Sequence, residues 1–367
     1  MAKPEGDGGH KGGQDDGGAD HHGPPTPALP RKGGGGSVPR EILDALYRMR
    51  LLEPGQRVPG ERLTGGVSSD IWRIDLPSGV VCVKRALAKL RVAADWRAPV
   101  TRNLYEARWM RRANAAVPGA APDVLGQDKE SGALAMQYLP IENHPLWKNE
   151  LRDGRADPDF AAHVARSLVR IHAATAADPQ VAAEFPTDEI FFDIRLEPYL
   201  IASARAHPDR AQALASLVAT TQANKCALVH GDVSPKNILV GPAGPVFLDA
   251  ECAWWGDPAF DLAFCLNHLL LKCLWTPAAR AGFLTCFDAL AAAYLAGVAW
   301  EAAAVLEARA AHLLAGLFLA RVDGKSPVEY ITCERDKDRV RRTALALLAA
   351  PVDRLGEVRS AWAREIG

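Results

Sequence analysis

Asp232, Asn237 and Asp249 each lie at the end of a short apolar run within residues 227–263. The turn residues Gly241–Gly244 separate the second run from the third, so these two runs predict a β-hairpin. Its ends would bring the two acids and the amide into one small region. Their oxygens are hard ligands of the kind that Mg²⁺ prefers, and one carboxylate is left over to meet a hydroxyl group. The stretch therefore predicts a site for a magnesium ion and a polyphosphate.

The spacing of these residues is more specific than their types. His230, Asp232 and Asn237 match H-x-D-x-x-x-x-N, the catalytic-loop pattern of kinases, and Asp249 lies where a second metal-binding aspartate follows. With HGD in place of HRD and Asp-Ala-Glu in place of DFG, the stretch resembles the aminoglycoside phosphotransferase and choline kinase group of small-molecule kinases. The alternative is a surface loop between two core strands that is rich in turn residues by chance.

This resemblance carries expectations about fold and roles. It implies an α+β, bilobal, protein-kinase-like fold, with a small β-rich N-terminal lobe and a larger, mostly helical C-terminal lobe. It implies that Asp232 is the catalytic base and that Asn237 and Asp249 bind Mg²⁺. It also implies that ATP is the phosphate donor.

Length and composition limit the other possibilities. A chain of 367 residues suits two lobes, and its 48% hydrophobic content allows a large core. A formal net charge of -1 gives no general attraction to nucleic acid or to an anionic membrane. The seven cysteines lack CxxC spacing, which predicts free thiols in a reducing cytoplasm and no zinc site. The apolar run near Leu269–Leu271 is too short and too polar at its flanks to span a bilayer.

We divide the chain into three parts. Residues 1–37 have many Gly, Asp and His and almost no large apolar side chains, so they predict a disordered tail. This tail lacks the apolar region of a signal peptide. Residues 38–140 are predicted to form the nucleotide-binding lobe, and residues 141–367 the catalytic and substrate lobe.

A Gly/Ser loop in the first lobe is a candidate phosphate-binding segment. It lies between two predicted strands and contains Gly65, Gly66, Ser68 and Ser69. Their backbone N–H groups and hydroxyls could bind phosphate oxygens, and an ordinary hairpin turn is the alternative.

Lys84 ends the apolar strand Val80–Val83 and follows this loop, where kinases have their phosphate-binding lysine. Such a lysine needs a carboxylate partner. Glu106 shares a predicted helix face with small and apolar residues that should dock on the sheet, so we expect it to pair with Lys84. The alternative is a surface glutamate beside neighbouring arginines. Gln137 and Leu139 match, by order alone, the hinge whose backbone pairs with adenine.

A last group of residues comprises low-specificity candidates for contact with the substrate. They are Glu251, Trp254, Arg321, Asp323 and Lys325. Glu251 follows Asp249 by two and would face the same way on an extended strand. The last three lie in a loop after a long helix, where late helices of small-molecule kinases often wall the acceptor site; a charged helix–helix turn is the alternative. The GKS in this loop is no P-loop, because the first glycine and the preceding strand are missing.

The expected function is transfer of the γ-phosphate of Mg-ATP to a hydroxyl of a small molecule, preferably a metabolic sugar or an amino alcohol. The segments VKRALAKLR and DAECAWWGDPAFD resemble methylthioribose kinases. An aminoglycoside-resistance phosphotransferase is the alternative, disfavoured because no dense acidic cluster is present. A pseudokinase-type nucleotide-binding module is disfavoured because Lys84 and all three motif residues are present, and a protein kinase because no Ala-Pro-Glu follows Asp249. We expect no obligate protein partner.

Overall fold

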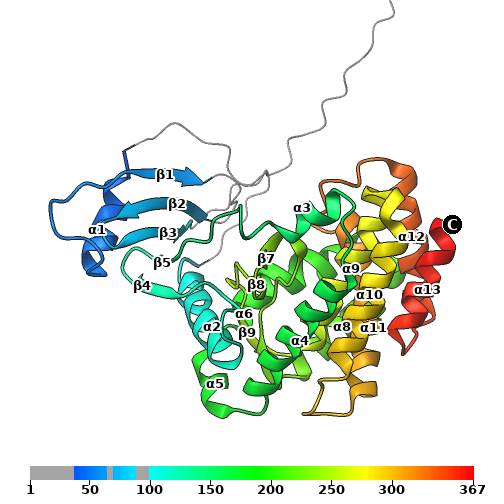
Figure 1. Cartoon of the computed structure of the whole chain (residues 1–367). Coiled ribbons are helices and arrows are strands. Elements are labelled where there is room, and N and C mark those ends of the chain that lie inside the picture. The colour runs from blue at the N-terminus through cyan, green and yellow to red at the C-terminus, as the bar shows by residue number, and fades with distance from the viewer. Residues whose placement is uncertain (1–36, 64–68, 88–98) are drawn as a thin grey trace, which may run out of the picture.

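A five-stranded antiparallel sheet forms the N-terminal part of the protein (Figure 1). The structure is a computed structural model that describes residues 37–63, 69–87 and 99–367. The predicted tail therefore lies outside the described residues, apart from Ser37. The strand order is β1-β2-β3-β5-β4. The strands are β1 (Gly60–Leu63), β2 (Ser69–Leu76), β3 (Gly79–Ala86), β4 (Val124–Asp128) and β5 (Ala133–Gln137).

One helix covers each face of this sheet. α1 (Arg40–Arg48) packs Ile42 into an apolar cluster with side chains of β2 and β3, including Val83. α2 (Arg102–Ala116) contacts β3, β4 and β5 and lies between the sheet and the rest of the protein (Figure 1). Because side chains alternate along a strand, Val83 faces α1 and Lys84 faces α2. The alternation thus directs a charged side chain toward the helix that carries Glu106.

The remaining described residues are mostly helical. α4, α9, α10 and α11 pack against one another, and the main core lies among them. The α-helices are α3 (Trp147–Arg152), α4 (Pro158–Thr175), α5 (Pro179–Glu184), α6 (Asp188–Phe191), α7 (Ala202–Ala206), α8 (Ala211–Ala223), α9 (Ala259–Trp275), α10 (Arg280–Leu295), α11 (Ala303–Asp323), α12 (Glu334–Ala349) and α13 (Leu355–Ile366). A π-helix, η1, spans Phe192–Ile201.

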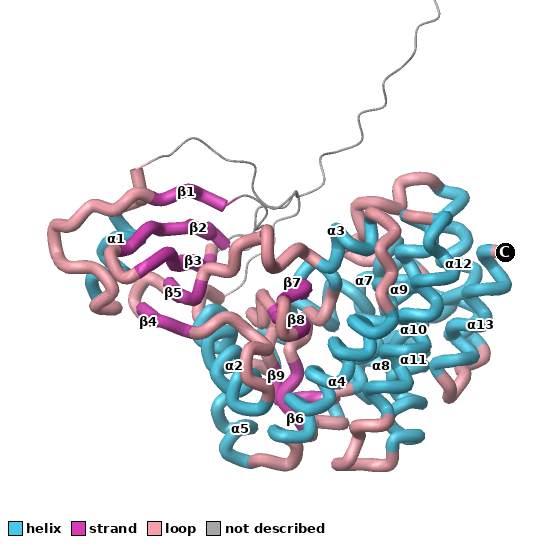
Figure 2. Tube along the Cα trace, in the orientation of Figure 1, coloured by secondary structure: helices cyan, strands magenta, loops and turns pink. Residues whose placement is uncertain are grey.

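Two small sheets lie between the five-stranded sheet and the helical part (Figure 2). β7 (Ile238–Gly241) and β8 (Gly244–Phe247) form the predicted hairpin, with Leu239 opposite Val246. β6 (Ala227–Val229) pairs with β9 (Trp254–Gly256), a pairing that was not predicted. Both strands that precede the two motif aspartates therefore end at the junction of the two parts.

A side-chain cap and a proline set helix boundaries in this part of the protein. The side chain of Asp157 caps α4 by accepting hydrogen bonds from the N–H groups of Asp159 and Phe160. The segment 197–224 is divided among η1, α7 and α8. Pro198 within η1 has no N–H to donate, which favours a break in the α-helical pattern. The final helices α12 and α13 were not predicted.

The sheet followed by helices agrees with the expected two-part fold, and the domain boundaries stay a prediction. All seven cysteines are free, as predicted. Within the described residues, Pro277–Leu295 and α11 are long and apolar enough to cross a membrane by length and composition alone. The core helices of a globular protein pass the same test, so this is weak evidence.

Candidate active site

Lys84 and Glu106 form the pair that the sequence predicts. Lys84 Nζ lies 2.9 Å and 2.7 Å from the two carboxylate oxygens of Glu106, and both side chains are buried. Burial raises the pKa of Glu106, although the positive charge of Lys84 acts to lower it. Burial also disfavours the ammonium form of Lys84, but the charges of Asp249 and Glu106 outweigh it and raise the pKa of Lys84. Lys84 is therefore a fixed positive charge.

The same ammonium group also contacts the carboxylate of Asp249, from the other side of the junction. Asp249 has a left-handed backbone (φ 66°), which an aspartate tolerates better than most residues. This turn follows the end of β8 at Phe247, so the prediction that Glu251 extends from the same strand is wrong. Glu251 instead accepts a hydrogen bond from Nε of Arg102 at 2.9 Å. Burial would raise the pKa of Asp249, but Lys84 and Lys236 outweigh it and lower that pKa.

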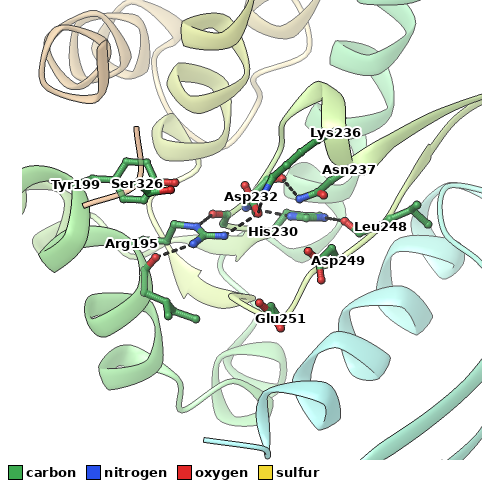
Figure 3. Close-up of polar contacts among 12 residues, drawn as sticks. Arg195, Tyr199, His230, Asp232, Lys236, Asn237, Leu248, Asp249, Glu251 and Ser326 are labelled. Carbon is green, nitrogen blue, oxygen red and sulfur yellow. Dashed lines mark hydrogen bonds and ion pairs between the residues drawn. The ribbon is translucent and has the colours of Figure 1, made fainter. Parts of the chain in front are cut away.

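Asp232 lies between two cations (Figure 3). Its Oδ2 is 2.8 Å from Nη2 of Arg195 and 3.2 Å from Nζ of Lys236. Its other oxygen, Oδ1, is buried and finds no hydrogen-bond partner in residues 37–63, 69–87 and 99–367. One oxygen of the carboxylate is thus held in place, and the other is left to accept a proton or a hydrogen bond.

His230 connects the catalytic loop to the strand that leads to Asp249. Its Nδ1 accepts a hydrogen bond from the backbone N–H of Asp232 at 3.1 Å. Its Nε2 lies 3.1 Å from the carbonyl oxygen of Leu248, to which it donates in this tautomer. Burial lowers the pKa of His230, in agreement with a neutral ring that donates at one nitrogen and accepts at the other. The histidine of the motif therefore positions Asp232 and Asp249 relative to each other.

Asp261, in the first turn of α9, supports the loop from below. Its carboxylate accepts hydrogen bonds from the backbone N–H groups of His230 (2.7 Å) and Gly231 (2.8 Å). It also lies 3.2 Å from Nε2 of His172, whose Nδ1 is 2.6 Å from the hydroxyl of Tyr294. Asp261 and His172 thus brace the loop from within the helical part.

The residues proposed as metal ligands fit a magnesium ion by the chemistry of their donors. Nδ2 of Asn237 donates to the backbone carbonyl of Asp232 at 3.1 Å, which leaves Oδ1 of Asn237 as an acceptor. Asp249 adds a carboxylate. Among the described residues, no group of three or more His, Cys, Asp or Glu could hold a metal by itself. This agrees with Mg²⁺, which usually takes one or two protein ligands and completes its shell with water and phosphate oxygens.

The structure describes only some of the residues that were predicted to bind the nucleotide. Gly65, Gly66 and Ser68 lie outside the described residues. Ser69 begins β2, and its buried hydroxyl has no hydrogen-bond partner among the described residues. The two residues predicted at the hinge, Gln137 and Leu139, differ in their environments. The N–H of Gln137 donates to the carbonyl of Asp123 at 2.9 Å, so it is not free for adenine. Leu139 is partly buried and packs in a small apolar cluster between the two parts.

Trp254 is not among the residues around Asp232. Its ring is buried and stacks on Phe191 at 4.2 Å, and its N–H donates to Asp188 at 2.8 Å. Its ring therefore belongs to the core and its N–H is held by Asp188, so we leave Trp254 out of the acceptor site.

The three candidate residues at the end of α11 and in the loop after it lie in different environments. Asp323 pairs with His207 and Arg341, and Lys325 pairs with Glu197. These contacts agree with the alternative of a charged helix–helix turn. Arg321 is buried instead, and its Nη1 donates to the hydroxyl of Tyr199 at 3.0 Å and to Ser326.

Arg195 is the residue that the sequence reasoning missed. It lies in the π-helix η1, whose i→i+5 hydrogen bonding is rare and occurs often at functional sites. Besides Asp232, its guanidinium donates to the backbone carbonyls of Gly231 and Ile194. No motif marks Arg195 in the sequence, because its role depends on a contact with a loop more than thirty residues away.

Comparison with known proteins supports the family resemblance that was inferred from the motif. Residues 59–306 match the model of the phosphotransferase enzyme family that includes the aminoglycoside phosphotransferases. The chain is 23% identical over 254 residues to the methylthioribose kinase of Yersinia enterocolitica. This alignment covers 61% of this chain and 62% of that protein. It is 24% identical over 273 residues to the methylthioribose kinase of Citrobacter koseri, covering 65% and 66%. The match thus spans less than two thirds of the length of these curated relatives.

Among solved structures, an amicoumacin kinase in complex with AMP-PNP and Ca²⁺ is similar in fold. Its TM-score is 0.50 at 13% identity, and the match covers 86% of this chain and 94% of that one. Likeness at this identity bears on the fold alone, and that fold is the bilobal, protein-kinase-like one expected from the motifs. Since the family model matches more than half of the sequence, the chain belongs to the phosphotransferase enzyme family.

Proposed function

We propose that the protein is an ATP-dependent kinase that phosphorylates a hydroxyl group of a small molecule. The observation that carries this proposal is the convergence of Lys84, Glu106 and Asp249 at the junction of the two parts, together with a buried, unpartnered oxygen on Asp232. A kinase needs these groups in one place, since its catalysis is mostly positioning and charge stabilisation.

The donor side of the site consists of fixed charges. Lys84, held by Glu106, would bind phosphate oxygens of ATP after exchanging its contact with Asp249 for them. Ser69 would donate its free hydroxyl to the same phosphates. Asn237 and Asp249 would hold Mg²⁺, which supplies neutralisation of the negative charge that the β- and γ-phosphate oxygens carry during transfer.

Asp232 binds and orients the acceptor molecule. Its free Oδ1 accepts the hydrogen bond of the substrate hydroxyl and aims the oxygen at the γ-phosphorus. The bond from that oxygen to phosphorus forms, the bond from phosphorus to the β,γ-bridging oxygen breaks, ADP leaves, and the hydroxyl proton passes to Asp232. Arg195 and Lys236 hold Oδ2 in place, so Asp232 acts mainly as a group that positions the hydroxyl.

The acceptor is proposed as a metabolite, a sugar-like or amino-alcohol-like molecule, and methylthioribose kinases are the curated relatives that bear on this. Free thiols at all seven cysteines favour a reducing compartment, so we propose a cytoplasmic enzyme.

Substitution of Asp232 by asparagine tests the proposal. Asp232→Asn should lower kcat by about 10²–10⁴, the usual contribution of a positioned acid–base group, and leave the affinity for AMP-PNP nearly unchanged. The measurement is Mg-dependent release of ADP in the presence of a panel of hydroxylated metabolites. Asp353→Asn, a change at an exposed aspartate paired with His312, is the matched control and should keep full activity. Turnover by Asp232→Asn at the wild-type rate would remove Asp232 from this role, and absence of any Mg-ATP turnover would favour a pseudokinase.

A further inference from the structure

One face of α9 leads from the catalytic loop into the helical part. Asp261, in its first turn, binds the backbone of the loop. Phe264, His268 and Lys272 follow at intervals of four residues, so they share one face of the helix. The ring of Phe264 lies 5.8 Å from the guanidinium carbon of Arg195, next to Asp232. At a rise of about 1.5 Å per residue, Lys272 lies roughly 12 Å further along this face.

Lys272 is a buried lysine that forms no ion pair within the part of the chain that the structure describes. The residue is 1% exposed, and the carboxylate of Glu329, whose charge raises the pKa of Lys272, is itself paired with Lys148. Nζ lies 3.8 Å from the ring centroid of Trp275 and 3.9 Å from that of Tyr330, and these two rings stack at 4.5 Å. Aromatic rings attract a cation but do not replace a hydrogen-bond acceptor. Burial accordingly lowers the pKa of Lys272 well below its ordinary value.

Other unpartnered polar atoms accompany Lys272. Nε2 of His268, Nε of Arg321 and the hydroxyl of Tyr330 are buried, and none has a hydrogen-bond partner in the part of the chain that the structure describes. Burial lowers the pKa of His268, and the charges of Arg321 and Lys272 lower it further, so both cations lie near its ring. Buried polar atoms in a folded protein are almost always paired, and a group of unpaired ones indicates a ligand.

Arg321 links this group to Asp232. Its Nη1 donates to the hydroxyl of Tyr199, and the guanidinium of Arg195 lies 5.9 Å from the centroid of the Tyr199 ring. Figure 3 shows Tyr199 and Ser326 on the Arg195 side of Asp232. Tyr199 thus connects Arg321 to Arg195 and, through Arg195, to Asp232.

The sign of the charge in this region is positive. Arg195 and Lys236 are both paired with Asp232, and Lys148 is paired with Glu329. Arg321 and Lys272 have no carboxylate within salt-bridge distance in the described ranges. A cationic acceptor, such as an amino alcohol or an aminoglycoside, would be repelled there, whereas an anion would neutralise both charges.

We propose that the acceptor is an anion, a hydroxylated molecule with a carboxylate or phosphate group that binds Lys272 and Arg321 while its hydroxyl meets Asp232. This inference rests on the proposed function and narrows it, because it excludes amino alcohols as the preferred substrates. His268 donates or accepts one further hydrogen bond, and the rings of Trp275 and Tyr330 pack against the carbon skeleton.

Calorimetry on the full chain without nucleotide tests binding. The carboxylate probes are glycerate and gluconate, the phosphate probes are glycerol 3-phosphate and ribose 5-phosphate, and glycerol, ribose and choline are the neutral and cationic counterparts. We expect at least one anionic probe to bind at least about tenfold more tightly than its neutral counterpart, and the stronger pair identifies the anionic group. No preference for any anionic probe would overturn the proposal.

Variants then locate the site. Lys272→Met and Arg321→Gln should each weaken binding of that probe about tenfold or more and leave AMP-PNP affinity unchanged, whereas Lys337→Met, at a half-buried lysine of α12 paired with Glu334, should alter neither. Lys272→Met should melt no lower than wild type, because it removes a buried amine that forms no ion pair. Wild-type affinity for anions in both Lys272→Met and Arg321→Gln would refute the inference. Turnover with choline or ribose but with no anion would refute it and leave the proposed function standing; anion binding without Mg-ATP turnover would refute both.

Discussion

Replacement of Lys84 by methionine should leave a buried charge without a partner. In the structure both oxygens of Glu106 accept hydrogen bonds from Lys84, and no other donor among the described residues contacts them. Glu106 is 1% exposed, so water cannot take over. Removal of one partner of such a pair costs about 3–5 kcal/mol of folding free energy. Asp249 also loses a partner, but its side chain is 30% exposed, so solvent screens that loss.

Urea unfolding measures this cost. For a denaturant slope of about 3 kcal/mol per molar, the midpoint of Lys84→Met should fall by roughly 1–2 M relative to wild type. The double variant Lys84→Met/Glu106→Leu removes both charges and should recover most of the loss, since apolar replacement of a buried pair is often neutral. A double variant no more stable than Lys84→Met would show that the loss comes from packing and not from the charge of Glu106.

The loss should also depend on pH. Burial raises the pKa of Glu106, and removal of Lys84 raises it further. A carboxyl group with a raised pKa in the folded state destabilises that state as pH rises through this pKa. Asp249 acts in the same direction. With Lys84 present the pKa of Asp249 is lowered in the folded state, so this carboxylate stabilises the fold at pH values above its pKa in the unfolded chain. That stabilisation is lost on acidification. The stability difference between wild type and Lys84→Met should therefore shrink as pH falls, and a difference independent of pH would refute the reasoning.

Substitutions at three more residues test the site. Asp249→Asn should raise the Mg²⁺ concentration for half-maximal activity by about tenfold or more, and an unchanged Mg²⁺ titration would contradict its role as a ligand. Asp261→Ala should lower the melting temperature, because two buried N–H groups lose their acceptor at about 1–3 kcal/mol each, whereas Asp261→Asn keeps one acceptor and should lose less. Gly231→Ala should reduce both stability and kcat, because φ is 81° and the added Cβ would lie 2.8 Å from the carbonyl oxygen of Cys252; a wild-type kcat would argue against a strict requirement for this turn.

The sequence alone determined the elements that carry the site. Asp232, Asn237 and the β7–β8 hairpin are close along the chain, so local spacing is enough to place them together. Alternation along β3 and the helical period of α2 placed Lys84 and Glu106 on facing surfaces, because each side chain's direction follows from the regular backbone of its own element.

Only the tertiary structure decided how the charges are paired. The left-handed backbone at Asp249 directed Glu251 to Arg102, and η1 brought Arg195 to Asp232. Lys272 lost its access to solvent through packing against Tyr330, almost sixty residues later in the chain. An electrostatic contact depends on the distance between two groups in space and leaves no periodic pattern along the chain. The placement of the loop from His230 to Asn237 was therefore predictable from spacing, and the pairing of the charges around it was not.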